Sequence, residues 1–454
     1  MKISFKKWNR RHARLKSEGL KDAWYSGSLS CRYKQGDLGL DRLAFDDSPA
    51  ALRLWNFVLS ENERLEAHRK QKKKIIGALK DMGTVPVIVY CFSDMVAFYP
   101  DGTWWTPCFM KNSDGLLRAA EKAGFGESYC PVRAMLGAFI TRDQFPIPDA
   151  LVCSTGAVCD DLSAIAQYLS ANGHDIYWWD VPYRRELREG ESFVSGLSGE
   201  KIPEEMVAYV RKGLSGVVAY LETKSDDSLT AQMLQGGISR ANRIRGRIRE
   251  ILSAIWCADV CVMPALETMM IEVLAIHYCS DMDETEVVLD DIADTVKHRV
   301  KQGVNVLKGN PVRIFWVNPV ADLSVLNLIE DCGGRVCGSD YMFRHAVEFI
   351  DETLDPLTAL AIAALSDPMV GSVRSRAELI CDVIMSRAIE ALVIARIPGA
   401  SHCAAESEAI SRIVKERYGI PVVTVEVSPM TDSIRETLVT RFRALVETAE
   451  GRRK

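Results

Sequence analysis

Several short motifs that identify common functions are missing from this sequence of 454 residues. No two of its thirteen cysteines form a Cys-x-x-Cys pair, which excludes zinc ribbons, thioredoxin-type redox sites and ferredoxin-type cluster runs. Neither a P-loop nor a Gly-x-Gly-x-x-Gly fingerprint is present, so we do not expect the chain itself to hydrolyse ATP or bind NAD. Any metal site must therefore be assembled from cysteines that lie far apart in the sequence.

Long hydrophobic runs are also lacking. No apolar run reaches the ~18–20 residues that a membrane span needs. The first residues are basic but have no apolar stretch behind them, so we expect no secretory signal and a cytoplasmic protein. The odd cysteine count then argues against a disulfide framework. The net charge of -5 gives no indication of a nucleic-acid partner.

The N-terminal part of the chain is predicted to be a helical arm over residues 1–82. Its long helix begins at Ser48-Pro49, a pair suited to the cap and the first helical position, and runs to about Met82. Residues 83–200 then alternate strands with helices, starting with the apolar run VPVIVYCF at Val85. Such alternation implies parallel strand pairing in a first α/β domain.

The C-terminal half changes texture twice. Residues 201–308 are almost continuously compatible with helix and are predicted to be a helical insert. Residues 309–454 alternate strands and helices again, as a second α/β domain. The predicted fold class is therefore α/β, with two Rossmann- or flavodoxin-like parallel-sheet domains joined by a helical segment.

Two segments of the chain echo one another around a cysteine. Each is a strand followed by a short Gly-containing loop, then Cys159 or Cys403 at a helix start. In open α/β sheets, ligands bind beyond the carboxyl ends of the strands. A helix N-terminus also favours the thiolate, which is the form that binds metals. Both cysteines are therefore candidate ligands, one from each domain.

Cys130 follows the same rule, because Pro131 suits the first position of a helix. Arg133, one turn on, adds a positive charge and is a candidate cofactor contact. An iron–sulfur cluster with bound thiolates is an anion, and helix N-termini bind anions. The three cysteines together thus predict a polynuclear iron–sulfur cluster. With three protein ligands, one iron stays open to water or substrate.

Other assignments of the cysteines remain open. A free cysteine is often a plain buried thiol, and Cys91 or Cys108 could replace Cys130. Cys332 and Cys337 are interpreted as packing residues. Four further cysteines in apolar stretches are predicted to be small buried hydrophobes: Cys153, Cys257, Cys261 and Cys279.

At these residues the sequence resembles the 2-hydroxyacyl-CoA dehydratase and benzoyl-CoA reductase superfamily. The resemblance covers about residues 80–450. It is carried, in order, by SYCPVRAMLGAF, LVCSTGAVCDDLSAIAQYL with DVPY, GGRVCGSDY, HCAAESEAISRIVKERYGIPVVTVEV and TRFRALVE. It implies two α/β domains and one [4Fe-4S] cluster on Cys130, Cys159 and Cys403.

The resemblance also implies partners and a chemistry. These are a homologous second subunit, a separate ATP-hydrolysing iron–sulfur activator and an acyl-CoA substrate. One low-potential electron converts the thioester carbonyl into a ketyl radical anion, with net dehydration or net reduction as the outcome. One departure is visible, because the Cys-x-x-x-Pro-x-Glu segment of many members is absent at Cys91. The acyl group, and whether this subunit or its partner binds it, stay open.

Weaker signals concern residues beside the cysteines and elsewhere. His402 is a candidate proton donor, and Ser154 and Thr155 are candidates to hydrogen-bond a thioester oxygen. Aromatic residues at 103–105 and 177–179 could line a dry pocket or be ordinary core. The alternatives to a catalytic subunit are an electron-relay subunit and a non-redox α/β protein. Five arginines in one predicted helix could contact CoA phosphates or the activator, or could form a solvated or subunit-facing surface: Arg240, Arg243, Arg245, Arg247 and Arg249.

Overall fold

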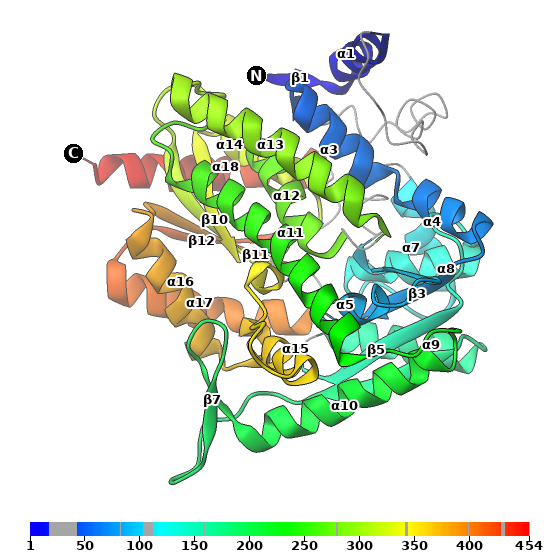
Figure 1. Cartoon of the computed structure of the whole chain (residues 1–454). Coiled ribbons are helices and arrows are strands. Elements are labelled where there is room, and N and C mark those ends of the chain that lie inside the picture. The colour runs from blue at the N-terminus through cyan, green and yellow to red at the C-terminus, as the bar shows by residue number, and fades with distance from the viewer. Residues whose placement is uncertain are drawn as a thin grey trace.

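Two four-stranded parallel sheets and a set of long helices make up the protein (Figure 1). The computed structural model describes residues 1–17, 43–81, 83–102, 112–157, 159–277, 280–340, 344–397, 399–427 and 432–453. The predicted α/β class with two parallel-sheet domains is confirmed. No helix within these described ranges is long and apolar enough to cross a membrane.

The first sheet has the strand order β4-β3-β5-β6, with all neighbours parallel. The strands are β3 (Lys74–Leu79), β4 (Met95–Phe98), β5 (Ala150–Gly156) and β6 (Ile176–Val181). The helices between them are α5 (Val85–Val89), α7 (Asn112–Lys122), the 3-10 turn η3 (Pro131–Arg133), α8 (Ala134–Thr141) and α9 (Asp160–Ala171). The chain thus alternates strand and helix as the sequence predicted.

Two predictions at the start of this domain are wrong. The helical pattern ends with α4 (Glu61–Lys70), and the central strand β3 follows it, so the first sheet begins before residue 83. The run at Val85 is not a strand but α5. The Asp81 carboxylate accepts the backbone N–H groups of Gly83, Thr84 and Val85, and Pro86 occupies the first turn. Capping of this kind starts a helix even in a β-branched run.

The second sheet has the order β10-β9-β11-β12, again parallel throughout. Its strands are β9 (Val312–Val317), β10 (Gly334–Asp340), β11 (Ala391–Arg396) and β12 (Val422–Glu426). Its helices and turns are α14 (Ser324–Asp331), η5 (Arg344–Val347), α15 (Pro356–Leu365), η6 (Pro368–Val370), α16 (Val373–Ser386), α17 (Ser401–Tyr418) and α18 (Asp432–Gly451).

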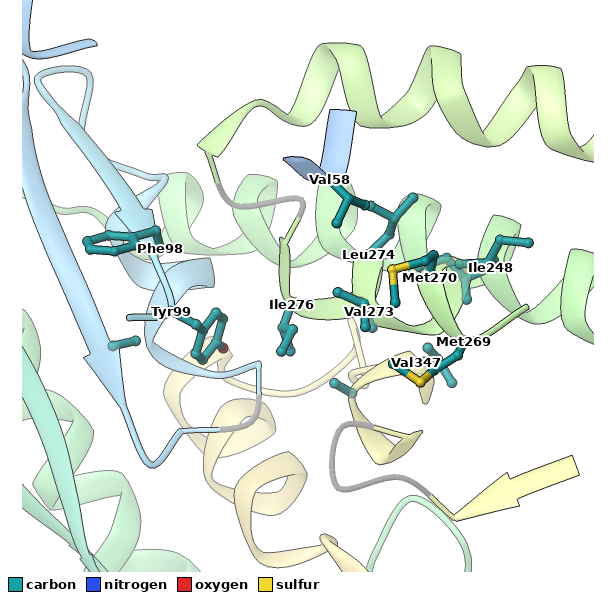
Figure 2. Close-up of a cluster of buried hydrophobic side chains, with 14 of the residues drawn as sticks. Val58, Phe98, Tyr99, Ile248, Met269, Met270, Val273, Leu274, Ile276 and Val347 are labelled. Carbon is teal, nitrogen blue, oxygen red and sulfur yellow. The ribbon is translucent and has the colours of Figure 1, made fainter. Parts of the chain in front are cut away.

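Long helices join the two sheets, in the region predicted as a helical insert. They are α10 (Glu204–Glu222), α11 (Ala231–Cys257), α12 (Ala265–His277) and α13 (Met282–Gln302), preceded by a hairpin of β7 (Phe193–Ser195) and β8 (Lys201–Pro203). Figure 2 shows α12 residues such as Met270 and Leu274 packed against Val58 and Ile248. Residues 265–276 of α12 are all buried, so α12 is a core helix that anchors the interior between the domains.

The N-terminal arm is a small layer on these helices. It contains β1 (Lys2–Ser4), α1 (Phe5–Ser17), β2 (Ala44–Asp46) and α3 (Pro49–Leu59), with β1 and β2 antiparallel. Ser48 caps α3 as predicted, accepting the N–H of Ala51. An aromatic cluster fixes the layer: Phe5, Trp8, Phe45 and Trp55.

Candidate functional site

Cys159 lies where the chain leaves the first sheet. It follows β5 and is the N-cap residue of α9, so it occupies the helix start that the sequence predicted. Its side chain is 5% exposed. Burial raises the pKa of the Cys159 thiol to about 12, although the nearby backbone N–H of Leu162 and the Lys80 ammonium lower it. The thiol is therefore protonated at neutral pH unless a cation binds it.

Cys130 is joined to the start of α9 by a hydrogen bond from its backbone. It is the N-cap residue of η3, with Pro131 at the first position, and its side chain is 7% exposed. Its N–H donates a 2.9 Å hydrogen bond to Oδ2 of Asp161. Asp161 is two residues beyond Cys159 on α9, so this bond joins the two cysteine-bearing segments.

The segment that carries Cys403 comes from the second domain and meets Cys130. Cys403 is the third residue of α17, where the structure describes the backbone and not the side chain. Before it, Gly399 has a φ of +83°. A Cβ at Gly399 would lie 2.3 Å from the carbonyl carbon of Tyr129 and 2.5 Å from the nitrogen of Cys130. Only glycine fits so close to another backbone.

The three cysteine segments therefore converge at the carboxyl edge of the first sheet. Among the side chains that the structure describes, no three histidine, cysteine or acidic groups are arranged to hold a metal ion. The side chains of His402 and Cys403 lie outside that set, so their predicted roles stay predictions.

Lys80 is a residue of this region that the sequence reasoning missed. It follows β3, is 5% exposed, and donates from Nζ to Ser163 Oγ at 2.9 Å and to the Gly156 carbonyl at 3.3 Å. Burial lowers the pKa of Lys80, whereas Cys153 and Cys159 act to raise it. A lysine directly after the buried run IIGAL was the available signal, hidden by the helix assignment to that segment.

Arg133 is a second buried cation here, as the sequence proposed. Its Nη1 donates to the Tyr129 carbonyl at 2.7 Å, while its buried Nε has no hydrogen-bond partner in the described part of the chain. Burial lowers the pKa of Arg133, and the charges of Cys130 and Glu127 act to raise it. Two buried thiols beside two buried cations fit an anionic, thiolate-bound group.

The candidates at the end of β5 are occupied by local contacts. The Ser154 hydroxyl donates to the Lys80 carbonyl, and Thr155 donates to Asp180 Oδ1 at 2.8 Å. Their remaining capacity is to accept hydrogen bonds, whereas a thioester oxygen needs a donor. The geometry therefore favours a structural role for both hydroxyls.

A small cavity lies beyond the ends of β3, β5 and β6. It has a volume of about 20 Å³, which is room for roughly one water molecule. Its lining includes Lys80, Asp81, Ser154, Trp179 and Asp367. Trp179 belongs to the predicted 177–179 aromatic stretch, in which Tyr177 stacks on Tyr220. The 103–105 stretch lies outside the described residues.

The other cysteines have mostly packing roles. Cys91 donates to the carbonyls of Val87 and Met233 and packs on Gly237 of α11, contacts that tie it to a helix packed against α5. Cys153, Cys261 and Cys337 are buried as predicted, and Cys332 is partly buried. Cys257 is exposed, because it is the last residue of α11, so its predicted burial is wrong. Cys108 and Cys279 lie outside the described residues.

The α11 arginines face acidic residues of this same chain. Arg240 pairs with Asp283, Arg243 approaches Glu286 at 3.6 Å, and Arg247 pairs with Asp290 at 2.6 Å. Arg245 is buried and donates to the carbonyls of Gly83 and Glu348, while Arg249 pairs with Glu348. These contacts favour the solvated and structural reading over contact with CoA phosphates.

The edge of the second sheet contains a closed polar network. Arg376 of α16 is 1% exposed and donates to Asp340, Glu406 and Asn318 at 2.8, 2.5 and 2.7 Å. Glu406 is one turn beyond Cys403 on α17. Larger cavities of about 210 and 460 Å³ lie nearby, between the β7–β8 hairpin and α16. Their linings carry charges of both signs.

The comparison with protein families agrees with this arrangement. Residues 82–449, most of the chain, match the family model described as 2-hydroxyglutaryl-CoA dehydratase, D-component. The chain belongs to this family. The dehydratase D-component match confirms the resemblance to the 2-hydroxyacyl-CoA dehydratase superfamily, and the word component indicates a multi-component system with a partner subunit. No curated protein matches the chain.

Proposed function

We propose that this chain is the cluster-bearing component of a 2-hydroxyacyl-CoA dehydratase. Cys130, Cys159 and Cys403 hold one [4Fe-4S] cluster, and a homologous second subunit completes the enzyme. A separate ATP-hydrolysing iron–sulfur activator delivers the electron, since the chain has no phosphate-binding motif of its own. When bound, such a cluster supplies one low-potential electron, which reduces the thioester carbonyl of an acyl-CoA to a ketyl radical anion.

The convergence of the three cysteine segments is the observation that carries this proposal. Cys130 is joined to the Cys159 helix by the bond to Asp161, and the loop before Cys403 presses on the Cys130 backbone through Gly399. These contacts bring residues 130, 159 and 403, from two domains, to one sheet edge.

Side chains of this protein provide positive charge at that edge and exclude water from it. Loading requires the buried thiols to lose their protons, so binding of the cluster releases protons. Lys80 and Arg133 then face negative charge instead of neutral sulfur. The surrounding side chains are largely buried, which keeps water away from a reactive radical. His402, next to Cys403, is the candidate proton donor.

Iron and sulfide analysis after anaerobic purification tests the cluster. We expect about four irons per chain in the wild type and near zero in the Cys130→Ser, Cys159→Ser and Cys403→Ser variants. Cys257→Ser is the matched control, because this exposed thiol should leave the iron content unchanged. A wild-type chain that stays free of iron after careful reconstitution would overturn the proposal and leave a non-redox α/β protein.

A second candidate function is an electron-relay component whose partner binds the substrate. One observation favours it: the cavity of about 20 Å³ beside Lys80 and Ser154, at the ends of β3 and β5, is too small for an acyl group. Titration of the loaded component with an acyl-CoA, followed by the spectrum of the cluster, separates the two. A spectral change without the partner subunit supports the catalytic component, and a change that requires the partner supports the relay.

A further inference from the structure

We propose that Lys80 is the residue that balances the negative charge at the cysteine site, and that it thereby sets the reduction potential there. This inference rests on the proposed function, because it assigns a role toward the cysteine-bound group. Lys80 is a positioning residue in this account, since it acts through its charge and touches neither substrate nor a reacting atom.

The Lys80 ammonium donates hydrogen bonds to one residue before Cys159 and one residue after it in the sequence. One partner, the Gly156 carbonyl, is three residues before Cys159, and the other, Ser163 Oγ, is four residues after it. The lysine side chain therefore spans from the end of β3 to the N-terminus of α9. This places a fixed positive charge beside the helix start that carries the thiol.

The Lys80 charge has no anionic partner close by. Within the residues that the structure describes, no carboxylate lies within 4.0 Å of its Nζ, although Asp160 and Asp180 act on it from further away. Lys2 shows the usual arrangement, because its ammonium contacts Glu330 and Asp331 at 3.1 Å. Burial of an ion without a partner of opposite charge is unfavourable, so the arrangement favours binding of an anion.

The backbone conformation at position 80 is one that lysine rarely adopts, which supports a specific role for the Lys80 side chain. Its φ of +57° lies in the left-handed region, which residues other than glycine rarely adopt. The Ser154 hydroxyl donates to the Lys80 carbonyl and so fixes this conformation. A glycine or asparagine would adopt this φ with less strain, yet the position carries a lysine. Strain of this kind persists where the surroundings require it.

A fixed cation favours the more negative of two redox states. Reduction adds one negative charge to the cysteine-bound group, so the Lys80 charge stabilises the reduced state more than the oxidised state. Replacing Lys80 with an uncharged residue should therefore make reduction harder. We expect about a tenfold lower ratio of reduced to oxidised cluster at a given potential, which is about 59 mV for one electron.

The test is a mediated redox titration of the reconstituted protein, followed by the visible and EPR spectra of the cluster. Lys80→Met removes the charge and Lys80→Arg keeps it. Lys74→Met is the matched control, because Lys74 is exposed at the start of the same strand. We expect a more negative potential for Lys80→Met and values close to wild type for Lys80→Arg and Lys74→Met.

Ser163→Ala covers the case in which Lys80→Met does not fold. It keeps the charge but removes the 2.9 Å partner of Nζ, so we expect a smaller negative shift. A folded Lys80→Met that loses its cluster while Lys80→Arg keeps it also supports the role of the charge. The inference would be wrong if the reduction potential stayed unchanged in both Lys80→Met and Ser163→Ala. If Lys80→Met does not fold, an unchanged potential in Ser163→Ala alone has the same meaning. Neither result would contradict the proposed function. Absence of iron from the wild type would overturn both the inference and the proposed function.

Discussion

Buried positive charges have different partners at the carboxyl edges of the two sheets. At the second sheet, the Arg376 guanidinium is matched by Asp340, Glu406 and Asn318, so the ionic network is closed. At the first sheet, the buried cations Lys80 and Arg133 have carbonyl or hydroxyl partners and no close carboxylate in the described structure. The two edges have the same topology but different electrostatic balance.

This difference separates a structural network from a candidate binding site. A closed network of buried charges specifies how helices pack, and it leaves nothing for a ligand to complete. Buried cations beside thiols lack an anion, which a thiolate-bound cluster would supply. We therefore interpret the second edge as a structural contact between α16 and α17, and the first edge as the proposed cluster site.

The largest effect that would test this contrast is the removal of Arg376. Arg376→Leu should lower the free energy of unfolding by about 3–5 kcal/mol, because it removes a buried cation and leaves two partly buried carboxylates unpaired. Chemical denaturation measures the change. Arg374→Leu, exposed on the same helix, should change stability by less than about 0.5 kcal/mol. Equal effects of the two substitutions would contradict a closed structural network.

The contact between the domains provides the next test. Gly399→Ala should cost about 1–3 kcal/mol and reduce iron loading, because its Cβ would collide with the backbone of Tyr129 and Cys130. Gly419→Ala is the control: it shares a positive φ, but its nearest neighbour is Arg452 Nη2 at 3.4 Å. Iron content per folded chain should fall only in the first variant. Full iron loading of Gly399→Ala would argue against convergence of the three cysteines.

A third test concerns Glu267, a buried carboxyl that lies away from both sheet edges and has one oxygen without a partner among the described residues. Glu267 of α12 accepts from the Asp46 N–H and from Trp55 Nε1, both at 2.9 Å, while its Oε2 has no partner among the described residues. Burial, and then the charge of Asp46, raise the pKa of Glu267 to about 8. The Glu267 carboxyl therefore holds its proton more tightly in the folded protein than an exposed glutamate does.

This shift fixes the sign of a pH effect. The folded state binds the proton more tightly than the unfolded state, so stability is fully present below about pH 4.5 and falls as pH rises toward 8. The slope is at most about 1.4 kcal/mol per pH unit. Glu267→Gln should flatten the pH dependence in denaturation series at pH 5–8. An unchanged profile would show that Glu267 does not titrate in this way.

The smallest effect is expected from the α11 arginines. Arg240→Ala and Arg247→Ala should each cost less than about 1 kcal/mol, because exposed ion pairs contribute little. Acyl-CoA affinity, measured by calorimetry with the assembled enzyme, should not change. A marked loss of affinity would instead restore contact with CoA phosphates as the role of this face.

Much of the fold follows from local patterns in the sequence. The strands predicted before Cys159 and Cys403 are present as β5 and β11, because burial on both faces requires continuous apolar runs. Helix starts at Cys130 and Cys159 follow from local capping chemistry. The strand β3 was missed because it begins at Lys74, the last residue of a basic stretch at residues 69–74 that continues the helical pattern of α4.

The sequence by itself determined the two parallel-sheet domains, the helical segment between them and the position of three cysteines at helix starts, since each depends on residues within a few positions of one another. Only the tertiary structure decided which groups meet. Three contacts join segments that lie tens to hundreds of residues apart: Gly399 with Cys130, Lys80 with the first turn of α9, and Arg376 with its polar partners. Such contacts follow from chain packing, and no local pattern encodes them.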